Sequence, residues 1–181
     1  MALDRRPITP DEILTVARLA AMPPERRAAF HRLRAHRRVP LGEAGRLDFQ
    51  CRDIAWAELQ DAVVAEGAPA EQALRAANAR LPTGAELVAV LRSPLAPEDV
   101  DYLATRIVLS VEVQSIRGLR DPGAELAAPV LRFPFTPWQI EKFTAPGVTV
   151  QVVVTHPLHS LVDILSDDVR HALAGDFDGG H

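Results

Sequence analysis

Apolar residues change their spacing about half-way along the chain. Up to about residue 80 they recur every three or four positions, which is typical of helices with one buried face. From residue 85 onward they alternate with polar residues, as in 107–113, which is typical of strands with one wet face. We therefore predict a mainly helical part over 8–80 and a mainly β part with short helices over 85–174.

Turn and capping residues divide these two parts into elements. The first helix is expected to open at Thr9 as N-cap, with Glu12 reaching back to it, and to continue to about Ala20. Thr136 and Gln139 repeat this arrangement later in the chain. The other predicted helices cover 24–37, 53–64, 71–79, a short segment from Pro97, and 167–174 after Ser166. The predicted strands cover 87–91, 107–113, 130–133, 148–155, 161–165 and a short segment around Leu47 and Phe49.

The predicted helices come first in the chain and most predicted strands come after them, and this order predicts the α+β class. We expect a single domain over 1–181, in which the N-terminal helices pack on a mostly antiparallel sheet formed by the C-terminal half. The chain of 181 residues is long enough for one core. The last residues, 175–181, are expected to form a flexible tail.

Composition narrows the class of protein. Hydrophobic residues make up 48% and charged residues 24%, and the formal net charge is -4, which argues against a chain that is basic throughout and coats nucleic acid. The N-terminus has no apolar leader and no segment is apolar enough for a membrane helix, so we expect a cytoplasmic protein. Cys51 is the single cysteine, which excludes an internal disulfide and an iron–sulfur cluster held by several thiolates of this chain. It is either a buried inert thiol or, near a helix N-terminus, a redox-sensitive one.

The strongest charge feature is the basic stretch within 24–38. If this stretch is helical, four of its residues, Arg27, His31, Arg34 and Arg38, fall at i, i+4, i+7 and i+11 on one face. Such a face could bind an acidic partner or a phosphate-bearing ligand, because guanidinium groups offer bidentate hydrogen bonds. It could also be a nucleic-acid-binding module or an ordinary solvated helix face.

Two smaller groups of polar residues are candidate sites. Arg52 and Asp53 could form a substrate clamp with a carboxylate base, although Asp53 equally suits the start of a helix. His156 and His159, at the end of an apolar strand, could bind a metal ion or carry protons, or simply hydrogen-bond to the backbone. If the protein is a small enzyme or ligand-binding protein, Arg52, Asp53 and His156, with Arg132, should converge in one concave site.

The chain contains no glycine-rich phosphate loop, G-x-S-x-G elbow, Cys-x-x-Cys pair or dinucleotide-binding fingerprint. We therefore predict no cofactor, and a metal ion remains only the alternative for the two histidines. The lack of these sequence motifs favours a non-catalytic protein over an enzyme.

Several segments, taken in order, resemble an uncharacterised bacterial family, domain of unknown function 3501. They are Ile8 to Asp11, Arg37 to Gly42, Phe49 with Arg52 and Asp53, Leu131 to Pro137, His156 with Pro157, and Leu165 to Leu173. The chain departs from the family pattern at Gln50, Cys51, Thr155 and His159. The resemblance implies no established activity. Through the gene neighbourhood of the family, it implies an accessory role beside rubrerythrin-like proteins and iron–sulfur oxidoreductase subunits.

Our leading hypothesis is thus a cytoplasmic accessory protein that binds a protein partner through its basic helix or a sheet edge. The alternatives are the small enzyme described above and a nucleic-acid-binding module, which the acidic net charge disfavours. Self-association into a homo-oligomer is left open by the sequence.

Overall fold

The computed structural model describes residues 5–13, 24–65, 69–122 and 128–177. The helices are a short 3-10 helix, η1 (Pro10–Glu12), and α2 (Pro24–His36), α3 (Arg52–Ala65), α4 (Ala70–Ala79), α5 (Pro97–Ala104), α6 (Pro137–Thr144) and α7 (Asp167–Ala174). No helix in this described part of the chain is both long and apolar enough to cross a membrane.

Nine strands in the described residues form two antiparallel sheets. The first sheet has the order β1 (Arg38–Pro40), β2 (Arg46–Phe49), β3 (Glu86–Arg92), β7 (Val130–Pro134), β6 (Leu119–Arg120). The second has the order β5 (Gln114–Arg117), β4 (Ile107–Val111), β8 (Val150–Thr155), β9 (Ser160–Ile164). The α+β single-domain prediction is confirmed, and the strands divide into two sheets, the first of which takes β1 and β2 from the mainly helical part.

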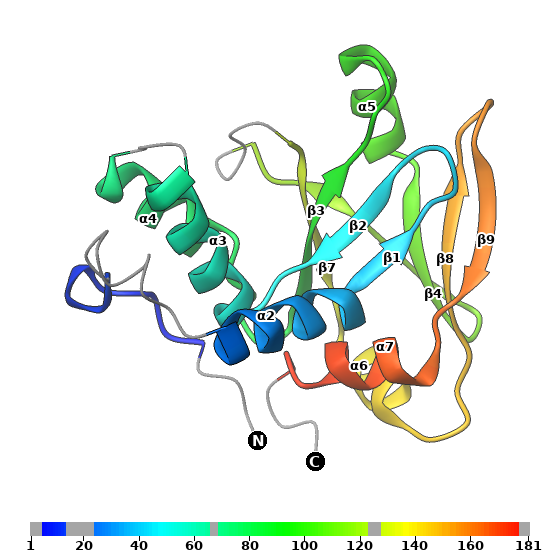
Figure 1. The fold of residues 1–181 in the computed structure, drawn as a ribbon. Helices are drawn as coiled ribbons and strands as arrows, with labels where there is room; N and C mark the ends of the chain where they lie inside the picture. The colour runs from blue at the N-terminus through cyan, green and yellow to red at the C-terminus, as the bar shows by residue number, and fades with distance from the viewer. Residues whose placement is uncertain (1–4, 14–23, 66–68, 123–127, 178–181) are drawn as a thin grey trace.

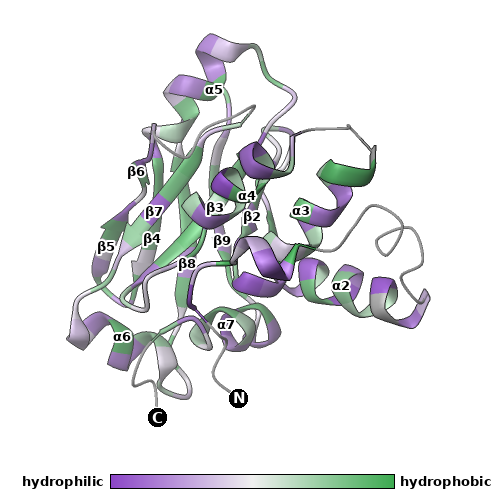
Figure 2. Ribbon diagram, turned by 90° about the vertical axis from the view of Figure 1, so that its left-hand side faces the viewer, coloured by the Kyte–Doolittle hydropathy of each residue, from purple (hydrophilic) through white to green (hydrophobic). Residues whose placement is uncertain are grey.

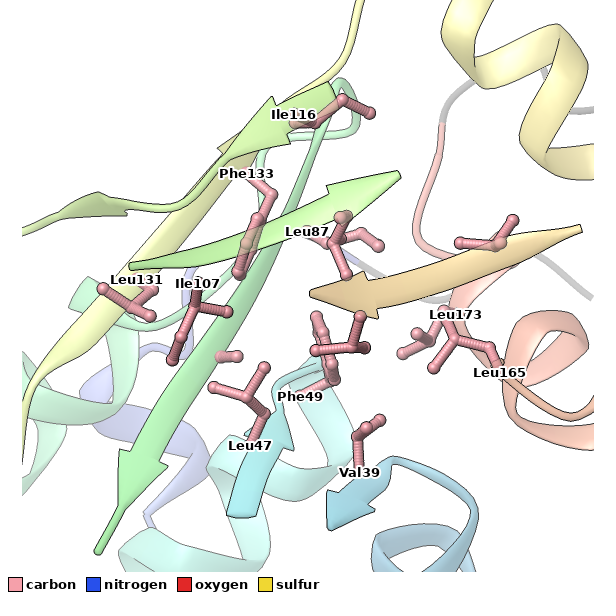
Figure 3. Packing of buried hydrophobic residues seen from close by; sticks show 14 of the residues in the cluster. Val39, Leu47, Phe49, Leu87, Ile107, Ile116, Leu131, Phe133, Leu165 and Leu173 are labelled. Carbon is pink, nitrogen blue, oxygen red and sulfur yellow. The ribbon is translucent and has the colours of Figure 1, made fainter. Parts of the chain in front are cut away.

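The core lies between the two sheets. Alternating residues of both sheets, among them Leu47, Leu87 and Phe133 from the first and Leu109 and Val152 from the second, belong to one buried cluster. Figure 3 shows labelled side chains of this cluster, contributed by strands of both sheets and by α7, meeting in a common interior. The apolar residues whose alternation predicted the strands therefore point into an interior that the two sheets share.

Helices cover the outer face and the ends of this body. The outer face of the first sheet, with Val88, Val90 and Val130, contacts Ala79 at the end of α4, and α3 packs on α4. Figure 1 shows α3 and α4 on the opposite side of the strands from β8 and β9. In both ribbon views α5 lies at one end of the sheets, and α6 and α7 lie at the other (Figures 1 and 2). The early helices thus cover one side of the β-rich part, as predicted.

Two of the predicted caps form at helix starts. Thr136 and Gln139 exchange hydrogen bonds at the start of α6, and Ser166 accepts one from the backbone of Val169 at the start of α7. At the start of the first predicted helix, Glu12 accepts a hydrogen bond from the backbone N–H of Thr9 as expected, and η1 ends at Glu12, because Ile13 is extended. The rest of the predicted helix, to Ala20, lies outside the described residues.

Three short strands, β1, β5 and β6, were not predicted. They fall where turn residues interrupt the hydrophobic pattern, and each pairs with only one neighbouring strand. Between β4 and β5, Glu112 has a φ of 56° and reverses the chain, so that the predicted strand 107–113 ends at Val111.

A buried ion pair joins the end of α2 to the end of the described chain. Arg37 donates two hydrogen bonds to Asp176, at 2.9 and 2.8 Å, and others to the carbonyls of Ala172 and Gln50. The exposed fractions of the two charged side chains are 2% and 1%. Burial disfavours the charge on Arg37, but the hydrogen bonds and charge of Asp176 raise the pKa of Arg37 above its ordinary value.

This pair corrects the prediction of a flexible tail over 175–181. Asp176 is held by Arg37, and the ring of Phe177 packs against Phe135 and Phe143 with centroids 4.7 and 5.5 Å apart. Residues 175–177 therefore belong to the packed structure, since a buried charge and a buried ring fix them, while 178–181 lie outside the described residues.

We predict that breaking this pair destabilises the protein more than removing both partners. Arg37→Met or Asp176→Asn leaves a buried charge without its partner and should lower the free energy of unfolding by about 3–5 kcal/mol. The double variant Arg37→Met/Asp176→Asn should lose less than the sum of the two single variants, as measured by urea unfolding. The control is the exposed pair Arg120–Asp101, whose loss should change stability by about 1 kcal/mol or less. Additive single effects would contradict the coupling.

A second prediction concerns the β1–β2 turn. Gly45 has a φ of 120°, and a Cβ there would lie 2.0 Å from the carbonyl oxygen of Arg92. Gly45→Ala should therefore lower the free energy of unfolding by about 3 kcal/mol or more. Gly42→Ala is the matched control, because Gly42 has a φ of 61° and a Cβ there would meet nothing within 4 Å, so about 1–2 kcal/mol is expected. Equal effects in thermal or urea unfolding would show that the contact with Arg92 does not matter.

Candidate functional site

The outer face of the first sheet carries an unusual concentration of arginine. Val39, Leu47 and Leu91 point into the core. Side chains alternate along a strand, so the residues next to these three on each strand point outward. On this outer face Arg38 lies opposite Asp48, and Arg46 lies opposite Arg92. Like charges directly opposite each other on neighbouring strands are unfavourable, and a carboxylate has to offset them.

Asp48 supplies that carboxylate. Its Oδ1 and Oδ2 accept hydrogen bonds from Nε of Arg46 at 3.0 and 3.2 Å, and Oδ2 also accepts one from Nε of Arg92 at 2.9 Å. The Nε atom of Arg38 lies 3.6 Å from Oδ1, close enough for an ion pair but too far for a good hydrogen bond. One carboxylate is thus shared by three guanidinium groups.

Glu58 of α3 extends the group. It accepts a hydrogen bond from Arg80 at 2.5 Å and a longer one from Arg92 at 3.4 Å. Burial lowers the pKa of Arg80 while Glu58 opposes that fall, and a guanidinium keeps its charge under either influence. We call Arg38, Arg46, Arg80 and Arg92 the arginine cluster. Its four cations share two carboxylates, which leaves a surplus of two positive charges.

A small hollow lies between α2, α3 and the first two strands; its cavity volume is about 20 Å³, and the space of about 220 Å³ around it includes open solvent. Its lining consists of Arg34, Arg38, Asp48, Phe49, Ile54 and Glu58. Arg34 comes from α2 and donates to Asp61 of α3 at 3.1 Å, whereas its buried Nε atom has no hydrogen-bond partner in the part of the chain that the structure describes. The hollow is therefore lined by arginine donors, carboxylates already bound to arginine, and two apolar side chains.

The structure distributes the predicted basic face over two elements. Arg27 and His31 are exposed on α2, and Arg34 is partly buried there. The prediction that Arg38 continues this helical face is wrong, because α2 ends at His36 and Arg38 begins β1. The helix ends there because Arg37 turns into the interior to bind Asp176. Arg34 and Arg38 still come together, as both line the hollow.

The residues of the enzyme hypothesis are held by different sets of partners. Arg52 donates to both oxygens of Glu12 and to the carbonyl of Arg6. Arg132 binds Asp121, Glu86 and the carbonyls of Ala79 and Leu81. Asp53 is exposed in the first turn of α3, where a negative charge suits the helix dipole. This arrangement favours a structural role for each residue over a shared catalytic site.

His156 and His159 do lie together at the end of β8. Their ring centroids are 5.1 Å apart, and the ring of Tyr102 from α5 is 5.2 Å from that of His156. The Nδ1 atom of His156 accepts a hydrogen bond from the backbone N–H of Leu158 at 3.1 Å. Within the described ranges, no group of three or more His, Cys, Asp or Glu side chains is placed to hold a metal ion. The backbone hydrogen bond agrees with the structural alternative for His156.

Cys51 lies at the junction of β2 and α3 and is buried. Burial raises the pKa of its thiol to about 11, since the charge of Arg37 only partly offsets desolvation. A thiol with so high a pKa is mostly protonated near neutral pH, which favours the inert alternative.

Five members of this site, Arg46, Asp48, Glu58, Arg80 and Arg92, were missed by sequence reasoning. Arg46 and Asp48 alternate with Leu47 and Phe49, so strand periodicity alone could have placed both on an outer face. Glu58 and Arg80 come from separate helical segments and gave no comparable indication.

Comparison with known proteins supports the family assignment. The model of a family described as protein of unknown function (DUF3501) matches residues 7–177. The chain therefore belongs to this family, as its ordered segments predicted. A protein of unknown function from Burkholderia pseudomallei K96243, known from its crystal structure, is similar with a TM-score of 0.83 and 21% identity, over 96% of this chain and 100% of its own. That similarity shows a shared fold. No curated protein matches the chain.

The ion-pair group at η1 generates a pH prediction. The Arg6 guanidinium, the Thr9 backbone N–H and the Arg52 guanidinium hold the pKa of Glu12 well below its usual range. A lowered folded pKa means that ionised Glu12 contributes its full stability above its unfolded pKa of about 4.3 and loses that contribution as the pH falls below this value. Glu12→Gln should therefore lower the urea midpoint of unfolding at about pH 7. The difference from the wild type should shrink below about pH 4.

The matched control for this experiment is Glu141→Gln, which removes an exposed carboxylate from α6. It reports the general effect of losing one negative charge. A difference between wild type and Glu12→Gln that grows towards low pH would contradict the assignment of Glu12.

Proposed function

We propose that the protein is a non-catalytic binding protein that docks an acidic protein partner on its basic surface. The basic surface comprises Arg27, His31 and Arg34 of α2 together with the arginine cluster. The carrying observation is the surplus of two positive charges around Asp48 and Glu58, in a chain whose formal net charge is -4.

Several properties of this surface suit a carboxylate-rich partner. Guanidinium groups bind carboxylates in a bidentate manner, and Arg38, with 47% of its side chain exposed, is accessible to a partner. The ion pairs with Asp48 and Glu58 hold the guanidinium groups in place, so less side-chain entropy is lost on binding. Exposed charge also raises the association rate and makes it depend on salt.

The α2 part of the basic surface lies on one side of the molecule. Figure 2 shows α2, with its hydrophilic turns, at the opposite side of the molecule from β5 and β6.

The first candidate partners are rubrerythrin-like proteins and iron–sulfur oxidoreductase subunits, which the family resemblance implies. We place this accessory role in the cytoplasm. In this proposal the redox chemistry belongs to the partner, and this chain supplies the docking surface.

The proposal is tested with purified rubrerythrin-like and iron–sulfur proteins from the same organism. We expect one of them to bind the wild-type chain in an anisotropy titration, with a Kd that rises as salt increases from about 0.05 to about 0.5 M. Arg27→Glu/Arg38→Glu should weaken binding about tenfold or more, because both changes reverse charge on the docking surface.

Arg117→Glu is the matched control for this experiment. Arg117 is an exposed arginine on β5 of the second sheet, on the opposite side of the molecule from α2. Its reversal should leave the Kd within about twofold. Absence of binding to both proteins at low salt, or equal loss in the two variants, would contradict the proposal.

A further inference from the structure

Two arginine side chains line the hollow. Arg34 donates from Nη2 to Asp61, and its buried Nε has no hydrogen-bond partner among the described residues. Arg38 also lines the hollow, and its Nε is 3.6 Å from Oδ1 of Asp48. Two guanidinium groups from different elements, α2 and β1, therefore border one space.

The carboxylates that line the hollow are already engaged by other arginines. Asp48 accepts hydrogen bonds from Arg46 and Arg92, and Glu58 accepts them from Arg80 and Arg92. Their negative charge is thus offset on the sheet side, which reduces the repulsion that they would exert on an incoming anion. The charges of Arg34 and Asp61 likewise offset each other.

The charge balance indicates which anion fits. The arginine cluster exceeds its two carboxylates by two positive charges. A carboxylate ligand would neutralise only one of them, whereas a phosphate monoester carries about -1.5 to -2 near neutral pH. A phosphate also accepts hydrogen bonds through three oxygens, which suits two guanidinium groups contributed by different elements.

The apolar lining strengthens such binding. Phe49 and Ile54 are both buried and form part of the wall. Low polarity beside a charged group reduces the local dielectric screening, so that the guanidinium groups attract an anion more strongly than they would on an open surface.

We infer that this hollow binds the phosphate group of a phosphate monoester, with Arg34 and Arg38 as its direct ligands and Arg92 as the residue that positions Asp48 and Glu58. The inference rests on the proposed function, because it names the chemical group that the basic surface recognises. The phosphate can come from a phosphorylated side chain of the partner or from a small phosphomonoester.

Isothermal titration calorimetry with two probes tests the inference. The probes are inorganic phosphate and a short glycine–alanine peptide that carries one phosphoserine. We expect one site per chain, with about tenfold weaker binding for Arg38→Gln and for Arg34→Gln. Arg38→Lys should be intermediate, because it keeps the charge and loses the bidentate geometry. The same peptide with Glu in place of phosphoserine should bind about tenfold more weakly.

Arg117→Gln is the matched control, since Arg117 is exposed on β5 of the second sheet, outside the basic surface, and does not line the hollow. Its binding should equal that of the wild type, and thermal unfolding should show that the variants in the hollow remain folded. Binding of the peptide alone identifies a phosphorylated partner, and binding of inorganic phosphate with or without the peptide supports a small phosphate site. No binding of either probe, or equal loss in Arg117→Gln, overturns the inference.

The two proposals can fail separately. If the acidic protein partner binds but neither phosphate probe does, the basic surface is a docking site without a phosphate pocket. If the phosphate probes bind in the hollow but both candidate proteins fail to bind at low salt, the partner proposal falls and the site remains.

Discussion

The buried ion pair between Arg37 and Asp176 fixes the arrangement of everything around the hollow. It joins the last turn of α2 to the residues after α7, and Arg37 also binds the carbonyl of Gln50 where β2 leads into α3. A charge at this depth is costly unless it is paired, so the pair allows few alternative positions for these three segments. Because Arg37 turns inward, the next residue, Arg38, starts β1 with its side chain on the outer face.

This constraint divides the basic stretch into two functional parts. Arg37 is neutralised inside the protein and contributes to folding, whereas Arg34 and Arg38 border a hollow whose carboxylates are bound by other arginines. The surplus positive charge therefore remains at one place on an otherwise acidic chain. Whether the ligand is a carboxylate-rich protein or a phosphate group, its recognition depends on the same placement of β1 against α2.

The sequence predicted the class of fold because hydrophobic periodicity and caps are local. Thr136 and Ser166 start their helices as expected, and the alternation in β4 and β8 faces the core. The site was predicted only in part. Arg37 looked like its basic neighbours, since its partner Asp176 lies 139 residues away, and nothing local distinguishes a buried arginine from an exposed one. Glu58 and Arg80 meet Arg92 only through the packing of α3 against α4 and the sheet, which periodicity does not specify.

The most direct test of this account follows the arginine Nε–H signals by ¹H–¹⁵N NMR while inorganic phosphate is added. We expect the signals of Arg34 and Arg38 to shift together and saturate, while the signal of Arg37 stays unchanged and exchanges slowly with water because it is buried against Asp176. Exposed Arg27 should show at most a small shift that does not saturate. A shifting or rapidly exchanging Arg37, or hollow arginines that respond no more than Arg27, would contradict the division of the basic stretch on which the account depends.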